Sequence, residues 1–399
     1  MRVQGAALRG LLGAIRRRLV RIPLAWMRLR VVRTLTRVAE SVHDRGPKPV
    51  DLEPRGALTE PDQFRPGASL HPLVRARTRI TTGAAVRLDG STFPPHPAGH
   101  VFGDRYCFLI GPVRVHAPSG LVFTEDRQFL RPSGPPLRDP AQTSRAMGAA
   151  EEVALFTLQG RIRRIDRRVF PIGVGPIRNY FHWNVDVLPR ILHAHRTYPD
   201  VVIVLADSPR HATESLEAAN IEFIVSSEVL LPAEVVLVDF SDPGWMHPSD
   251  AELLREFAGE RVGSVGNKRV FLSRADTRMD PIGTRNRRIE NEEELEEAMS
   301  EAGFDIVVPG TMPFREQVAS VAYAEIVAGI HGAGMSNLLW CQKRAHVIEI
   351  VSQALFDAGP RRLAAAAGHR YSQIILPPSP GSGYGSADAA IPKALSLVT

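Results

Sequence analysis

The chain has 399 residues, of which 44% are hydrophobic and 23% charged, and its formal net charge is +6. This length allows two domains of ordinary size, and the near-average composition excludes a largely disordered or fibrous chain. No apolar run reaches the roughly 18 residues of a membrane span. Cys107 and Cys341 lie far apart in the sequence, which excludes a disulfide framework and fits a reducing compartment. We therefore expect the protein in the cytoplasm.

Residues 1–45 alternate arginines with leucine, isoleucine, valine and tryptophan, against only two acidic residues, Glu40 and Asp44. This pattern predicts a basic amphipathic helix, whose residues 1–40 could lie on an anionic membrane surface, with the protein peripheral on the inner leaflet. A partner-docking helix and a frayed extension are the alternatives. No nucleic-acid motif follows, so nucleic acid is not an expected partner. Residues 46–100 are rich in proline, glycine and arginine, and we interpret them as an irregular linker.

Residues 101–262 are interpreted as a first α/β domain. Short apolar runs divided by glycine and proline predict strands, and a longer run over 180–197 has the apolar spacing of a helix. Strand and helix patterns then alternate, which predicts parallel pairing. The expected strands cover residues 106–110, 113–116, 121–124, 154–158, 168–171, 201–205, 222–225 and 235–238, and the later helices cover 212–219 and 249–259.

Residues 263–377 form the clearer alternating unit and predict a doubly wound, Rossmann-like domain. Asn291 and Glu294 have the spacing of a capping box for a helix over 291–303. Residues 378–399 are expected to be a mobile tail. The expected strands cover residues 269–273, 304–308, 326–330, 347–351 and 371–376, and the remaining helices cover 314–322, 336–341 and 361–367.

The most informative stretch is the predicted strand 326–330 and the sequence His331-Gly332-Ala333-Gly334 that follows it. Glycines at a strand-to-helix turn free the backbone to bend and to present N–H groups, and the following helix adds its positive end. An anionic ligand such as a phosphate fits this arrangement. The competing interpretation is that the glycines only make the bend.

His182 and Asp186 are four residues apart in a predicted helix, so both side chains lie on one face. The carboxylate could orient the imidazole for proton abstraction from a hydroxyl, or Asp186 could itself be the base. The alternative is a structural pair within the helix.

Arg274 directly follows a predicted strand, and Arg285, Arg287 and Arg288 come before the next helix. Guanidinium groups bind phosphate oxygens, although a solvated basic loop is the alternative. Asp-x-Asp is absent, so charge on a leaving phosphate would have to be met by side-chain cations and a helix end rather than by a metal. No nucleophile elbow, Walker motif or N-terminal Gly-x-Gly-x-x-Gly appears.

Taken in order, these motifs resemble those of glycosyltransferase family 61. The resemblance rests on Asn179-Tyr180-Phe181-His182-Trp183 with Asp186 and Leu188-Pro189-Arg190, Leu272-Ser273-Arg274, Arg287-Arg288-Ile289-Glu290-Asn291-Glu292, Phe314 to Gln317-Val318, His331-Gly332-Ala333-Gly334 with Ser336-Asn337-Leu338, and Val347-Ile348-Glu349. It covers about half of the chain. The chain departs from the family pattern at two places: an insertion at 276–284, and Gln342-Lys343-Arg344 in place of a proline-glycine turn. The insertion separates Arg274 from Arg287, so Arg274 is the stronger candidate for a phosphate ligand.

The resemblance implies an inverting transferase of the GT-B type: two Rossmann-like domains facing a cleft, with a nucleotide-sugar donor and a glycan acceptor. It further implies a metal-independent bacterial enzyme without a cofactor, acting in surface or capsular polysaccharide synthesis. A non-catalytic nucleotide- or glycan-binding module and another sugar-nucleotide enzyme are the alternatives. The base would be His182 or Asp186, and the donor residues would be Arg274, Arg287, Arg288, His331, Gly332, Ala333, Gly334, Ser336, Asn337 and Glu349.

Overall fold

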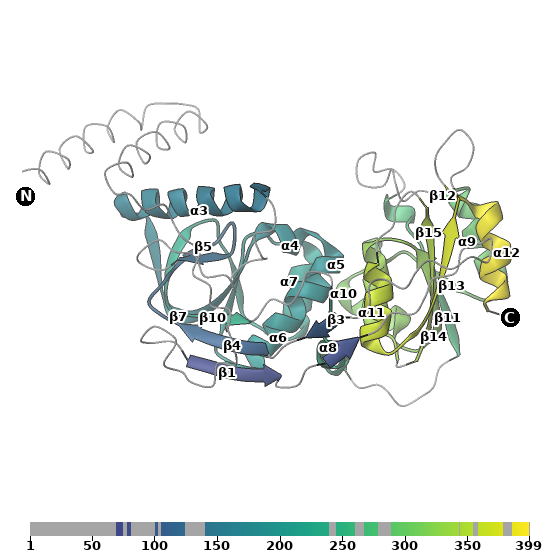
Figure 1. The fold of residues 1–399 in the computed structure, drawn as a ribbon, viewed down its shortest axis with the longest axis horizontal. Coiled ribbons are helices and arrows are strands. Elements are labelled where there is room, and N and C mark those ends of the chain that lie inside the picture. Colours follow the sequence, from purple (N-terminus) through teal and green to yellow (C-terminus); the bar gives the residue numbers. More distant parts are fainter. Residues whose placement is uncertain are drawn as a thin grey trace, which may run out of the picture.

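The fold is taken from a computed structural model, shown in Figure 1, which describes residues 69–74, 78–80, 100–102, 105–123, 140–238, 245–259, 267–277, 289–342, 344–353, 358–377 and 385–398. The predicted basic helix at 1–45 lies outside the described residues, as do Arg285, Arg287 and Arg288. Two sheets lie at opposite ends of the molecule, with helices between them.

The N-terminal half is built on an eight-stranded mixed sheet. Four strands on one side run parallel, as the alternation of strands and helices predicted, whereas those on the other side are antiparallel, so the Rossmann-like pattern covers only part of this sheet. The main path runs β1 (Ser69–Val74), β4 (Arg105–Ile110), β10 (Val229–Val238), β7 (Ile162–Ile172), β8 (Val202–Leu205) and β9 (Phe223–Val225), with β5 (Arg114–His116) and β6 (Leu121–Phe123) beside β10.

Two segments of this half differ from the sequence-based expectation. Strands β1, β2 (Thr78–Ile80) and β3 (His100–Phe102) fall within or at the end of the predicted linker. The linker was predicted partly from its prolines, but Pro72 is compatible with β1 because this strand lies at the edge of the sheet. Residues 154–158, predicted as a strand, end helix α3 (Pro140–Leu158). Ala149, Ala150 and Val153 are buried together, which is helical spacing that a short apolar run does not reveal.

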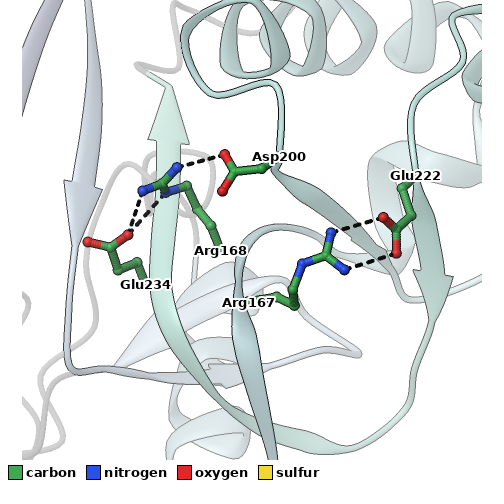
Figure 2. Close-up of polar contacts among 5 residues, drawn as sticks. All are labelled: Arg167, Arg168, Asp200, Glu222 and Glu234. Atoms are coloured by element: carbon green, nitrogen blue, oxygen red, sulfur yellow. Dashed lines mark hydrogen bonds and ion pairs between the residues drawn. The ribbon is translucent and has the colours of Figure 1, made fainter.

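Strand β7 carries arginines whose partners come from neighbouring parts of the sheet (Figure 2). Arg167 bonds Glu222 at 2.9 Å, and Arg168 bonds both Asp200 at 2.7 Å and Glu234 at 2.8 Å. These carboxylates balance the guanidinium charges. The two arginines therefore tie β7 to its neighbours rather than offering unpaired cations to an anionic ligand.

The C-terminal half is a fully parallel five-stranded sheet, as expected of a doubly wound unit. Its spatial order is β13 (Asp305–Val307), β11 (Lys268–Leu272), β14 (Ala324–Ile330), β15 (His346–Ser352) and β16 (Arg370–Leu376). Helices α9 (Glu292–Glu301) and α12 (Ala387–Ser396) cover one face, and α10 (Phe314–Val321), the 3-10 helix η7 (Ala333–Trp340) and α11 (Gly359–Ala367) cover the other.

The prediction of a mobile tail is wrong for residues 385–398. Strand β17 (Gly385–Ser386) pairs with β12 (Ile289–Glu290), and α12 follows it. Ala387, Ala390 and Ala394 are completely buried against α9 and the sheet, so apolar burial fixes this helix. Asn291 also differs from the expectation: it has a left-handed backbone and does not cap α9, whereas the Glu292 carboxylate accepts the amide of Ile289 at 3.1 Å.

The two halves meet through helices. Phe257 in α8 (Pro248–Ala258) stacks on Phe314 of α10 with ring centroids 6.0 Å apart, and Phe314 contacts Trp340 of η7 edge-on at 5.5 Å. Glu214 of α7 (Arg210–Ala218) accepts the amide of Phe314 at 2.6 Å. One apolar core therefore runs through both halves. Among the residues that the structure describes, no helix has the length and apolarity needed to cross a bilayer.

Gly173, which precedes α4 (Val174–Arg178), lies directly against another backbone segment. A Cβ at this position would lie 2.0 Å from the carbonyl oxygen of Ser119. Gly173→Ala should therefore lower the free energy of unfolding by roughly 2 kcal/mol, because one of the two backbones must move. Gly175→Ala, two residues later with no atom within 4 Å, is the control. Urea unfolding compares them, and equal stability of the two variants would contradict the packing argument.

Candidate functional site

The parallel sheet has a topological switch point between β11 and β14. From β11 the chain crosses to β13 on one side, whereas from β14 it continues to β15 on the other. Ligands of open α/β sheets bind at the carboxyl ends of the strands at such a point. Arg274 follows the end of β11 and His331 follows the end of β14, so the structure brings these two predicted residues together at this point.

Arg274 lies against the glycine turn. Its Nη1 donates to the carbonyl oxygen of His331 at 3.3 Å, and its Nη2 donates to Oγ1 of Thr277 at 3.4 Å. Gly332 has an extended backbone, with φ of 169°, so it is not needed for a left-handed turn. A Cβ there would lie 3.2 Å from Nε of Arg274. The glycine therefore allows the guanidinium to approach the turn, which differs from the sharp bend that the sequence suggested.

His331 is held by a buried carboxylate. Its Nδ1 bonds Oε1 of Glu349, which is completely buried in β15 and also accepts bonds from the Tyr371 hydroxyl and, at 2.7 Å, from Gln373 Nε2. Glu349, expected as a donor residue, therefore lies inside its strand with its carboxylate bonded to three side chains. The carboxylate orients the almost completely buried ring of His331 through Nδ1.

The remaining residues of the turn divide into two groups. Ala333 and Gly334 are half-buried. Ser336 and Asn337 are almost completely buried, and their side chains bond back to the carbonyl oxygens of Ala333 at 2.8 Å and Gly334 at 3.0 Å, respectively. The side chains of Ser336 and Asn337, which were expected to bind the donor, thus stabilise the turn from its buried side.

The second predicted group lies where α5 (Tyr180–His182) passes into the π-helix η3 (Trp183–Val187) and then α6 (Leu188–Thr197). The side chain of Asn179 caps this segment by accepting the amides of Phe181 at 3.0 Å and His182 at 3.3 Å. Single π turns inside helices occur frequently at functional sites. The predicted helix over 180–197 is confirmed, with a wider turn in its first half.

The predicted pairing of His182 with Asp186 is confirmed. Nδ1 of His182 lies 2.6 Å from Oδ2 of Asp186, and the carboxylate side chain is only 5% exposed whereas the imidazole is 42% exposed. Asp186 thus orients the imidazole ring through Nδ1 from the interior of the protein. Arg190, from the same motif, has a different role: its guanidinium bonds the carbonyl oxygen of Val238 at the end of β10.

The two groups of residues meet across the two halves of the chain. The hydroxyl of Tyr180 donates to Oδ1 of Asn337 at 2.8 Å, and Nδ2 of Asn184 donates to Oγ of Ser336 at 3.3 Å. Sequence reasoning did not single out Tyr180 or Asn184, although both lie in or next to the Asn-Tyr-Phe-His-Trp motif. The available signal in the sequence was that these two polar residues stand among the apolar residues of the predicted helix.

In the described part of the chain, no group of three or more His, Cys, Asp and Glu side chains is arranged to hold a metal ion. Cys107 and Cys341 are both buried, and neither is part of a disulfide. The guanidinium of Arg274 is a cation that the structure places at the switch point.

The fold and these contacts define an α/β protein that combines a switch point carrying Arg274 and His331 in one half with a histidine–carboxylate pair from the other. Residues 180–348 match the model of the family Glycosyltransferase 61. This match confirms the resemblance that the motifs indicated, and the family implies glycosyltransferase activity. No curated protein matches the chain.

Proposed function

We propose that the protein is an inverting glycosyltransferase of the GT-B type that moves a sugar from a nucleotide-sugar donor to a hydroxyl of a glycan acceptor. The observation that carries this proposal is the meeting of the His182–Asp186 pair with the switch point through the Tyr180–Asn337 hydrogen bond. A base for the acceptor and a site for the leaving phosphate are the two parts that such a transfer requires.

The diphosphate of the donor would lie at the end of β11 and β14. Arg274 can donate to phosphate oxygens, and the backbone N–H groups of Gly332, Ala333 and Gly334 lie around the same turn, whereas that of His331 donates to the carbonyl oxygen of Ile350 at 2.8 Å. His331, oriented by Glu349, adds a second nitrogen. These groups can stabilise the charge of the departing nucleoside diphosphate without a metal, and Arg287 and Arg288 remain candidate ligands from the segment before β12.

His182 is the better candidate for the base, because its imidazole is 42% exposed whereas the Asp186 carboxylate is buried behind it. Nε2 would take the proton of the acceptor hydroxyl, and the hydroxyl oxygen would form a bond to the anomeric carbon. The bond from that carbon to the phosphate oxygen breaks at the same time, and its electron pair leaves with the nucleoside diphosphate. Attack from the opposite side inverts the anomeric centre, while Asp186 stabilises the imidazolium.

The acceptor and the cellular role follow from the resemblance to family 61 and from the basic segment at 1–45. The resemblance and this basic segment together support a bacterial enzyme in the cytoplasm, bound peripherally at the inner leaflet, that adds sugar to a surface or capsular polysaccharide. Electrostatic attraction of the arginines to anionic headgroups would favour that position.

The proposal is tested by thermal unfolding with UDP, GDP, CDP, ADP and dTDP and their sugars, each with magnesium and with EDTA. A ligand that binds only the native state raises the melting temperature. We expect one nucleotide class to stabilise the protein equally in EDTA. Arg274→Gln should remove most of that shift, whereas Arg269→Gln, at the opposite end of β11, should retain it.

Two results would contradict the proposal. If no nucleotide shifts the melting temperature of the folded protein, a binding module for another ligand is favoured. If a sugar nucleotide binds but inorganic sugar phosphate is released in place of a nucleoside diphosphate, the protein is another sugar-nucleotide enzyme.

A further inference from the structure

Two of the hydrogen bonds between the two halves lead from the base segment toward the backbone of the phosphate turn. On one side are Tyr180 and Asn184, which flank His182 in sequence. On the other are Asn337 and Ser336, which they contact at 2.8 and 3.3 Å. We call these four residues the clasp. Each of its hydrogen bonds joins a residue within two positions of His182 to a residue of η7.

The clasp continues into the turn itself. Nδ2 of Asn337 donates to the carbonyl oxygen of Gly334 at 3.0 Å, and Oγ of Ser336 donates to that of Ala333 at 2.8 Å. Two series of hydrogen bonds, through Asn337 and through Ser336, therefore lead from the base segment to a backbone carbonyl of the turn that would hold the donor phosphates. A shift of α5 would be transmitted to that turn through two hydrogen bonds in each series.

These contacts are well defined because they are shielded from water. Ser336 and Asn184 are completely buried and Asn337 is 1% exposed. Burial raises the pKa of the Tyr180 hydroxyl to about 12, against the opposing hydrogen bonds of Asn184 and Asn337, so this hydroxyl remains a donor at all ordinary pH values. Loss of one partner would leave a buried polar group unsatisfied.

The clasp is not required to hold the halves together. The aromatic contacts among Phe257, Phe314 and Trp340 and the bond from Phe314 N to Glu214 already join them through α7, α8 and α10. The hydrogen bonds of the clasp also contribute less free energy to the association of the halves than burial of the apolar surface around them. Their distinctive property is directional: hydrogen bonds fix angles and distances that apolar packing leaves less defined.

We propose that the clasp residues Tyr180, Asn184, Ser336 and Asn337 are positioning residues that set the distance between the base His182 and the donor held at the turn. This inference rests on the proposed function and assigns Ser336 and Asn337 to alignment instead of donor binding. In-line displacement requires the acceptor oxygen and anomeric carbon to be aligned closely, so a small shift between the halves lowers the rate with little effect on donor affinity.

Amide hydrogen exchange tests whether the clasp couples the two segments. Tyr180→Phe removes one hydroxyl and should raise exchange by about fivefold in residues 332–340, across the interface, as loss of about 1 kcal/mol allows. Asn337→Ala should raise it similarly in residues 180–187. Tyr198→Phe, at a buried tyrosine beyond the end of α6, should change neither segment. If each variant loosens only its own segment, the coupling is refuted.

Steady-state kinetics with the donor identified by thermal unfolding then tests the positioning role. Tyr180→Phe should lower kcat by about 10- to 100-fold while the donor KM stays within about twofold of the wild-type value. An unchanged kcat, or a rise in KM alone, would show that the clasp is only structural or binds the donor. If no nucleotide binds the wild-type protein, the proposed function fails, and the exchange experiment still decides whether the clasp couples the halves.

Discussion

Replacing His182 with alanine should lower kcat for sugar transfer by about 10²- to 10⁴-fold, the usual contribution of a general base. The imidazole is 42% exposed and is held by Asp186 through Nδ1, and no other described side chain of this segment combines that exposure with a buried carboxylate partner. Donor binding should be retained, because the phosphate turn lies on the other half of the chain. Single-turnover transfer and the nucleotide-induced melting shift measure the two effects separately.

Asp186→Asn distinguishes between the two candidate bases. If His182 is the base, the new amide donates to Nδ1, which moves the ring proton to Nε2 and blocks proton abstraction. Both variants should then be similarly inactive. If Asp186 is itself the base, Asp186→Asn abolishes transfer whereas His182→Ala retains a substantial fraction of it.

His193 provides the matched control. It forms a similar pair with Asp250, at 2.8 Å, but between α6 and α8 in the interior. His193→Gln should therefore preserve kcat of the folded protein. If this variant loses as much activity as His182→Ala, or if His182→Ala and Asp186→Asn both retain turnover, the assignment of the base is wrong.

Lowering the pH from about 6.5 to 4 should reduce the free energy of unfolding by about 3 kcal/mol through His369 alone. Burial, with a smaller effect of the Arg255 cation, lowers the pKa of this imidazole from 6.5 to about 4. Its Nε2 donates to the carbonyl oxygen of Leu338 at 3.0 Å, so the neutral ring links the segment between α11 and β16 to η7.

The free energy of unfolding falls toward acid because the unfolded chain binds more protons than the folded protein. Between pH 6.5 and 4 the unfolded chain protonates His369 while the folded protein does not, so each step toward acid favours unfolding. His211 and His346 also have pKa values lowered mainly by burial, and they add to the effect in the same direction.

His369→Gln isolates the contribution of this histidine, because the amide can still donate to Leu338. Urea unfolding at about pH 8 and about pH 4.5 should show a smaller loss of stability on acidification for the variant than for the wild type. The comparison at pH 8, where both states hold a neutral imidazole, measures any change in packing. Equal acid sensitivity of the two proteins would show that His369 is not the group responsible.

Much of the fold could be predicted from local pattern. The alternation of apolar strands and amphipathic helices from β11 to β16 gave a parallel sheet with the correct strands, because both periods are written directly in the side chains. The same reasoning misassigned residues 154–158 and 385–398. A short apolar run and a run of alanines and serines do not reveal whether tertiary burial will make them helical.

The sequence by itself determined the ingredients of the site: an arginine and a histidine that each follow a strand, and a histidine and carboxylate one helical turn apart. The strand order that makes the ends of β11 and β14 a switch point required the tertiary structure. So did the roles of Glu349, Ser336 and Asn337, whose sequence positions suggested ligand contact. The physical reason is that local spacing fixes which residues share a face of an element, whereas burial and long-range partners decide whether a polar group meets a ligand or another side chain.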